Sequence, residues 1–131
     1  MFKRFQREPT TTDLFASARS GDVPLAEKAL RAGIVVDVRD RTQRTPLCVA
    51  AKYGRLEVIK LLLQHGANVN VVAAEGRTPI YFAVISGSLE VVKFLIEVGA
   101  RIDVQDSIGY TPHAYAKEGN QWHLLSVLQI G

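Results

Sequence analysis

A period of 33 residues runs through this chain of 131 residues. The phrase RTPLCVAAKYG at 44–54 returns as RTPIYFAVISG at 77–87 and as YTPHAYAKEGN at 110–120. Two further columns at this spacing hold Gly33, Gly66 and Gly99, and Gly21, Gly54, Gly87 and Asn120. Such repetition is a strong constraint, because each unit must form the same supersecondary structure and bury its apolar face against its neighbours. We therefore predict one domain built as an array of about four repeats.

Each repeat has the pattern of two helices and a protruding turn. Thr45 followed by Pro46 suits a helix start, because threonine can N-cap and proline at the first helical position forfeits no needed hydrogen bond. Gly54 suits the left-handed residue that ends such a helix. The run LEVIKLLLQHG at 56–66 has apolar residues at helical spacing, and ANVNVVAAEG at 67–76 predicts an extended, hairpin-like connection. The predicted class is all-α.

The domain is predicted to cover residues 11–131, after an N-terminal segment, 1–10, that we expect to be flexible. The repeats fall at approximately 11–39, 40–72, 73–105 and 106–131. We expect the first and last repeats to cap the array, because two columns that are apolar inside it become charged at its edges. These columns are Lys28, Leu61, Phe94 and Val127, and Ala18, Ala51, Val84 and Lys117.

Composition limits the class of protein. Apolar residues make up 47% and charged residues 22%, as in an ordinary globular chain. No apolar run approaches the roughly 18 residues that a membrane helix needs, so no membrane span is predicted. The single cysteine excludes an internal disulfide framework and fits a reducing compartment, so we expect an intracellular protein, cytoplasmic or nuclear. The net charge of +3 permits an acidic partner.

The stretches RTPLCVAAKYGRLEVIKLLLQHGANVN and RTPIYFAVISGSLEVVKFLIEVGARID resemble ankyrin repeats, which have this period and a Thr-Pro-Leu-His-x-Ala phrase. The resemblance covers about Thr11 to Gly131. It implies an ankyrin-repeat solenoid with protruding β-turn or hairpin loops that binds proteins, with no cofactor. One departure is that Cys48, Tyr81 and Ala114 replace the family's histidine, which in ankyrin proteins links neighbouring turns through hydrogen bonds.

Catalysis is the first alternative, and Cys48 is its most reactive candidate. A nucleophilic cysteine needs a nearby histidine or cation to lower its pKa. His113 lies two repeats away, on the order of 16–20 Å at about 8–10 Å per helix layer, which is too far for a dyad. No two histidines share a helix face at metal-ligand spacing, so we predict no metal site. We therefore expect Cys48 to be a buried apolar residue and the protein to have no catalytic residue.

The resemblance implies that partners bind on a concave surface formed by the turn tips and the exposed side of each first helix. The residues at these positions change from repeat to repeat, whereas scaffold columns keep their type. They are Arg19, Arg39, Arg41, Thr42, Arg44, Lys52, Tyr53, Ala74, Glu75, Arg77, Ile85, Ser86, Ser107, Ile108, Tyr110 and Glu118.

Basic residues outnumber acidic ones on this predicted face, with only Glu75 and Glu118 against its arginines and Lys52. The pattern predicts a protein partner that presents an acidic patch beside an apolar one. We expect a monomer that acts as an inhibitor, competitor or adaptor. Nucleic acid is the second alternative, but no aromatic residues are interleaved with the basic ones as a stacking platform requires.

Overall fold

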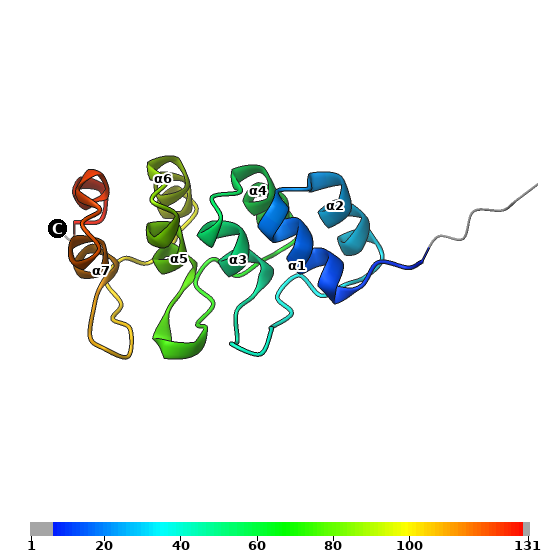
Figure 1. The fold of residues 1–131 in the computed structure, drawn as a ribbon, viewed down its shortest axis with the longest axis horizontal. Helices are drawn as coiled ribbons and strands as arrows, with labels where there is room; N and C mark the ends of the chain where they lie inside the picture. Colours follow the sequence, from blue (N-terminus) through cyan, green and yellow to red (C-terminus); the bar gives the residue numbers. More distant parts are fainter. Residues whose placement is uncertain (1–6, 130–131) are drawn as a thin grey trace, which may run out of the picture.

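The computed structural model describes residues 7–129, and this part of the chain is helical with no strand. Four helix pairs follow one another along the chain (Figure 1). Their elements are α1 (Thr11–Ser20), α2 (Val23–Arg31), α3 (Pro46–Lys52), α4 (Leu56–Gln64), α5 (Pro79–Ser86), α6 (Leu89–Glu97), α7 (Pro112–Glu118) and a 3-10 helix, η2 (Trp122–Val127). A short 3-10 helix, η1 (Ala74–Gly76), lies in the turn before α5.

The pairs stack side by side into the predicted solenoid (Figure 1). The first helices α1, α3, α5 and α7 each contact the next, as do the second helices α2 and α4, and α6 and η2. Ala50 and Ala51 of α3 and Ala83 of α5 are fully buried, and such small side chains allow neighbouring first helices to approach closely. Ile59, Leu62 and other large apolar side chains fill the layer between first and second helices.

The predicted helix ends are confirmed. Gly54 follows α3 with φ of 69°, in the left-handed region that glycine tolerates best. Asn120 replaces glycine in the same column and adopts φ of 59°. The predicted threonine caps are only partly correct: Thr111 Oγ1 accepts a hydrogen bond from the Ala114 amide, whereas the Thr45 side chain makes no capping bond.

The connections between repeats are hairpin-like, as predicted, because each folds back through a tight turn. No strand forms in them within residues 7–129. A backbone hydrogen bond spans each turn, donated by the amide of Asp40 to Arg44, of Ala73 to Arg77 and of Asp106 to Tyr110. Neighbouring turns are also joined, since the Ala74 amide donates to Thr42 at 3.2 Å and the Ser107 amide donates to Glu75 at 2.8 Å. The turn tips therefore form one connected row.

Gln43 occupies a strained position in the first of these turns. Its φ is 62°, and Gly76 and Gly109 hold its column in the next two repeats. A side chain in this conformation costs about 1–2 kcal/mol, and glycine loses about 0.5–1 kcal/mol in unfolded-state entropy. We therefore expect Gln43→Gly to raise the free energy of unfolding by about 0.5–1 kcal/mol. Urea unfolding followed by circular dichroism measures it; a decrease would contradict the proposed strain.

The predicted flexible segment lies mostly outside the described residues, which begin at Arg7. The Arg7 guanidinium donates to both carboxylate oxygens of Asp13, at 2.6 and 2.7 Å. Asp13 also accepts from the Thr10 amide and thereby completes a capping box at the start of α1. The Arg7 hydrogen bonds, followed by that from Thr10, hold the pKa of Asp13 well below its usual range. Arg7 is thus attached to the first repeat.

Candidate recognition surface

The residues predicted to bind a partner differ in exposure. Arg44, Lys52, Arg77, Ser86 and Tyr110 are half-buried. The exposed ones are Arg19, Arg39, Arg41, Thr42, Tyr53, Ala74, Glu75, Ile85, Ser107, Ile108 and Glu118. No predicted site residue is buried, so all of them can reach a partner at least in part. Their joint role in binding stays a prediction.

Two basic side chains in repeat two carry charge that no acidic group compensates. Arg41 lies at the exposed tip of its turn, and Lys52 lies near the end of α3 with its Nζ atom 5.6 Å from the ring of Tyr53. Neither makes an ion pair with any residue between 7 and 129. Arg39, by contrast, donates to the carbonyls of Gln43 and Val72 and so links two turns. Arg41 and Lys52 are therefore the clearest points of contact for an acidic group.

Arginines of two turns stack on aromatic rings of the following repeat. The Arg44 guanidinium lies 4.8 Å from the ring centre of Phe82, and that of Arg77 lies 4.8 Å from the ring centre of Tyr115. One repeat separates the two arginines and the two rings, so the contact itself is repeated. Cation–π contacts at this distance are worth about 0.5–2 kcal/mol. Because the protein's own arginines occupy these rings, Phe82 and Tyr115 are poor stacking platforms for nucleic acid bases.

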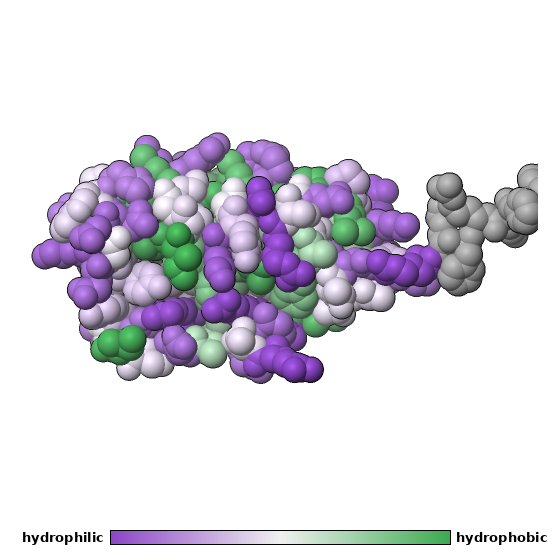
Figure 2. Space-filling view, viewed as in Figure 1, coloured by the Kyte–Doolittle hydropathy of each residue, from purple (hydrophilic) through white to green (hydrophobic). Residues whose placement is uncertain are grey.

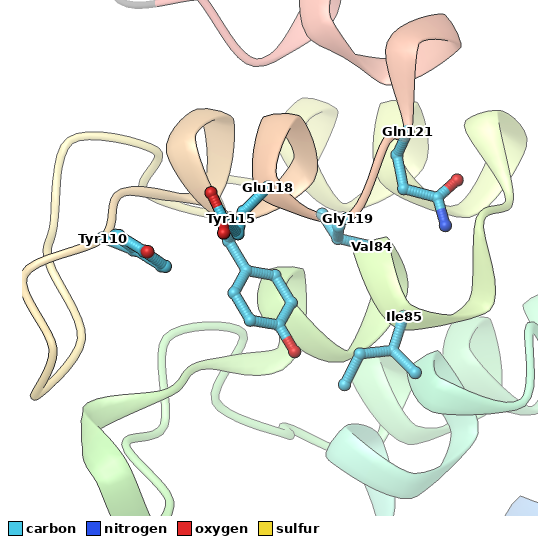
Figure 3. Close-up of a pocket in the computed structure, with 7 residues that line it drawn as sticks. All are labelled: Val84, Ile85, Tyr110, Tyr115, Glu118, Gly119 and Gln121. Carbon is cyan, nitrogen blue, oxygen red and sulfur yellow. The ribbon is translucent and has the colours of Figure 1, made fainter.

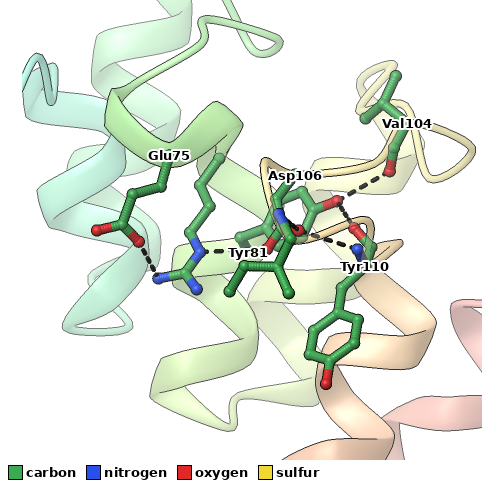
Figure 4. A network of polar contacts seen from close by, with 7 residues as sticks. Glu75, Tyr81, Val104, Asp106 and Tyr110 are labelled. Carbon is green, nitrogen blue, oxygen red and sulfur yellow. Dashed lines mark hydrogen bonds and ion pairs between the residues drawn. The ribbon is translucent and has the colours of Figure 1, made fainter.

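Arg77 differs from the other predicted basic contacts because the carboxylates of Glu75 and Asp106, both labelled in Figure 4, neutralise it. Its guanidinium lies 3.0 Å from Glu75 and 3.5 Å from Asp106, and only 18% of its side chain is exposed. A partner that approached Arg77 would have to displace contacts already formed. Among the basic residues predicted to bind a partner, those of repeats one and two make no ion pair within residues 7–129, whereas Arg77 of repeat three does.

Two aspartates that the sequence analysis did not single out organise the turns. One carboxylate oxygen of Asp106 accepts from the amides of Ile108 and Tyr110. Asp40 accepts in the same way from Thr42 and Arg44. Burial alone would raise the pKa of Asp40, but the hydrogen bonds from Thr42 and Arg44 lower it below its usual value. Aspartate is suited to such turns, because its short side chain bonds the backbone two residues on.

The third and fourth repeats present apolar surface. Ile85 is 40% exposed and Ile108, at a turn tip, is 66% exposed. Apolar side chains gather between α5 and α7 and at the tip of the last turn, whereas the tip of the turn that contains residues 40–44 is hydrophilic (Figure 2). Between α5 and α7 lies a hollow of about 280 Å³ (Figure 3). Its lining includes Val84, Ile85, Tyr110, Tyr115, Glu118 and Gln121.

Cys48 is fully buried, as the sequence predicted. Burial raises the pKa of its thiol, which disfavours the thiolate that a nucleophile needs. Its nearest polar contact is the Thr45 hydroxyl at 3.6 Å, a scaffold contact within the start of α3. Within the described residues, no cluster of histidine, cysteine and carboxylate side chains has the arrangement of a metal site. Over the same residues, no helix combines the length and apolar character that crossing a membrane requires.

Comparison with known proteins identifies one family. The model of the family described as ankyrin repeats matches residues 14–106 in three copies. No curated protein matches the chain. The matched residues span repeats one to three, and the helix pairs of the structure continue the same architecture through repeat four.

Proposed function

Because this chain belongs to the ankyrin repeat family, whose members are generally protein–protein interaction modules, we propose that it binds a protein partner through the face formed by its turn tips and first helices. The partner would present an acidic patch to repeat two and an apolar one to repeats three and four. Binding there would occlude a site on the partner, so the protein would act inside the cell as a monomeric inhibitor, competitor or adaptor.

The observation that carries this proposal is the separation of charge and apolar surface along one row of repeats. Arg41 and Lys52 have no acidic partner among the described residues, and Ile85 and Ile108 are exposed one and two repeats further on. Uncompensated charge at a protein surface steers an oppositely charged partner and fixes its orientation. Exposed apolar side chains beside it supply area that becomes buried on binding.

A pull-down with matched charge reversals tests the proposal. The baits are the unmodified chain, the double variant Arg41→Glu with Lys52→Glu, and a control, Lys28→Glu with Lys93→Glu, which makes the same change of net charge on the second helices α2 and α6. Arg77 is left unchanged, because its reversal would disrupt contacts with Glu75 and Asp106. Proteins retained from an extract of the native cells are quantified by mass spectrometry.

We expect one partner to be retained about five- to thirtyfold less by the Arg41 and Lys52 variant, since two lost charge pairs of about 0.5–1 kcal/mol each change the affinity by that factor. The control bait should retain that partner at the level of the unmodified chain. Equal retention by all three baits would show that the basic turn of repeat two does not bind the partner. Equal loss from both variants would show a dependence on net charge alone.

A further inference from the structure

The hollow between α5 and α7 has the size of a site for one side chain. Its volume of about 280 Å³ lies just below the range of roughly 300–1,000 Å³ that is usual for pockets of whole small molecules. Tyr110, Tyr115 and Ile85 surround it, with Glu118 and Gln121 on the side of α7 and the segment that follows it (Figure 3). The hollow opens on the face that carries the predicted contacts Ile85, Tyr110 and Glu118.

Glu118 is the charged member of this lining. Its side chain is exposed and makes no ion pair with any residue in 7–129. Lys117, the neighbouring cation on α7, is not among the residues that line the hollow. Arg77 lies close to Tyr115, but Glu75 and Asp106 compensate it. The charge available to a ligand in the hollow is therefore negative.

The two preceding repeats show what kind of group such a site takes. In each of them an arginine, Arg44 or Arg77, stacks on an aromatic ring of the next repeat. The same column holds Tyr110 in repeat four, so this repeat supplies an aromatic ring where the others supply a guanidinium. Arg77 already lies on the ring of Tyr115 in the lining of the hollow, so Tyr110 is the ring left for a further guanidinium, which would have to come from another molecule.

We propose that this hollow binds an arginine side chain of the protein partner. The guanidinium pairs with the carboxylate of Glu118 and stacks against the ring of Tyr110, and the aliphatic stem packs on Ile85. A planar guanidinium satisfies both demands, because it forms forked hydrogen bonds to carboxylates and stacks on aromatic faces. A purely apolar side chain would cover the Glu118 carboxylate and the Gln121 amide without giving either a hydrogen bond, which is costly. The inference rests on the proposed function, since it assigns one contact of that partner.

A titration followed by nuclear magnetic resonance tests the site without the partner. The probes are the Nα-acetyl, N-methylamide derivatives of arginine, of citrulline, which has the same shape without the charge, and of norleucine, which is apolar. The ¹³C-labelled Ile85 methyl group and the Tyr110 and Tyr115 rings report on the hollow. We expect saturable shifts with the arginine probe and an affinity about three- to fivefold higher than that for citrulline, as one exposed charge pair allows.

The variant Glu118→Gln should reduce the arginine-to-citrulline ratio to about one. Glu97→Gln, which removes another exposed carboxylate, on α6, should leave the ratio unchanged. The inference is overturned if citrulline or norleucine binds as tightly as arginine. It is also overturned if the ratio survives Glu118→Gln, or if none of the three probes shifts the reporter groups.

This test and the pull-down fail independently. The probes do not need Arg41 or Lys52, so their failure removes the arginine site and leaves the charge-reversal result standing. Conversely, a pull-down in which the reversal of Arg41 and Lys52 has no effect would leave a measured arginine preference at Glu118 intact.

Discussion

The variant Asp106→Ala is expected to lower the free energy of unfolding by about 3 kcal/mol, because it removes the acceptor of two turn amides and a carboxylate that pairs with the mostly buried Arg77. The Asp106 side chain is fully buried, and its carboxylate accepts hydrogen bonds from the amides of Ile108 and Tyr110. It also lies 3.5 Å from Nε of Arg77, which is itself mostly buried (Figure 4). Urea unfolding monitored by circular dichroism gives the change.

Two matched variants separate the contributions of the carboxylate. Asp106→Asn keeps an acceptor oxygen for the two amides and loses the charge opposite Arg77, so we expect a loss of about 1–2 kcal/mol. Asp40→Ala removes the corresponding turn bonds in repeat two, where the side chain is only partly buried and pairs with no arginine side chain within 4.0 Å; we expect a loss of about 1–2 kcal/mol. A cost for Asp40→Ala equal to that for Asp106→Ala would contradict the role given to burial and to Arg77.

The same two aspartates show where sequence reasoning failed. Ala73 stands between them in their column, so the period of 33 residues does not mark the column as acidic. Asp37 stands in a more regular column with Asn70 and Asp103, and it accepts a hydrogen bond from the Asn68 amide of the next repeat. Internal periodicity reveals a role that every repeat shares, and it conceals one that only two repeats use.

The helices were predictable because their signals are local. Apolar spacing within a single repeat places each helix, and Gly54 or Asn120 sets its end through the backbone conformation of one residue. The charge state of the recognition surface depends instead on contacts between repeats. Arg77 resembles Arg44 in sequence context, yet Asp106, 29 residues further on, helps to neutralise only Arg77. A count of basic residues cannot distinguish a paired arginine from an unpaired one.

The link that Tyr81 makes between repeats could not be predicted either, because a tyrosine stands where the family has a histidine. The family's histidine is absent, but the Tyr81 hydroxyl lies 2.8 Å from the Val104 carbonyl and 2.6 Å from the Tyr110 carbonyl, so one donor links α5 to both arms of the next turn. Thr78, at the start of the same helix, makes no such link, because its buried Oγ1 atom has no hydrogen-bond partner among the described residues. Tyrosine in this column thus restores a link between repeats by a longer reach.

At neutral pH, Tyr81→Phe is expected to lower the free energy of unfolding by about 2 kcal/mol, because the ring remains while the donor to Val104 and Tyr110 disappears. Phenylalanine fills the same space, so no cavity contributes to the change. Urea unfolding at pH 7 measures the difference from the unmodified protein. A difference below about 0.5 kcal/mol would show that the hydroxyl link does not stabilise the array.

The pH dependence of this difference provides an independent check. Burial first, and then the charge of Asp106, raise the pKa of Tyr81 from 10.0 to about 12. Because the folded-state pKa is the higher one, the unfolded state loses its proton first, and the stability contributed by the hydroxyl is complete below pH 10 and lost between pH 10 and about 12. The unmodified protein should therefore approach Tyr81→Phe in stability over this interval, as measured by unfolding of both at pH 7, 9 and 11. A constant difference across these values would mean that folding does not raise the pKa of the Tyr81 hydroxyl.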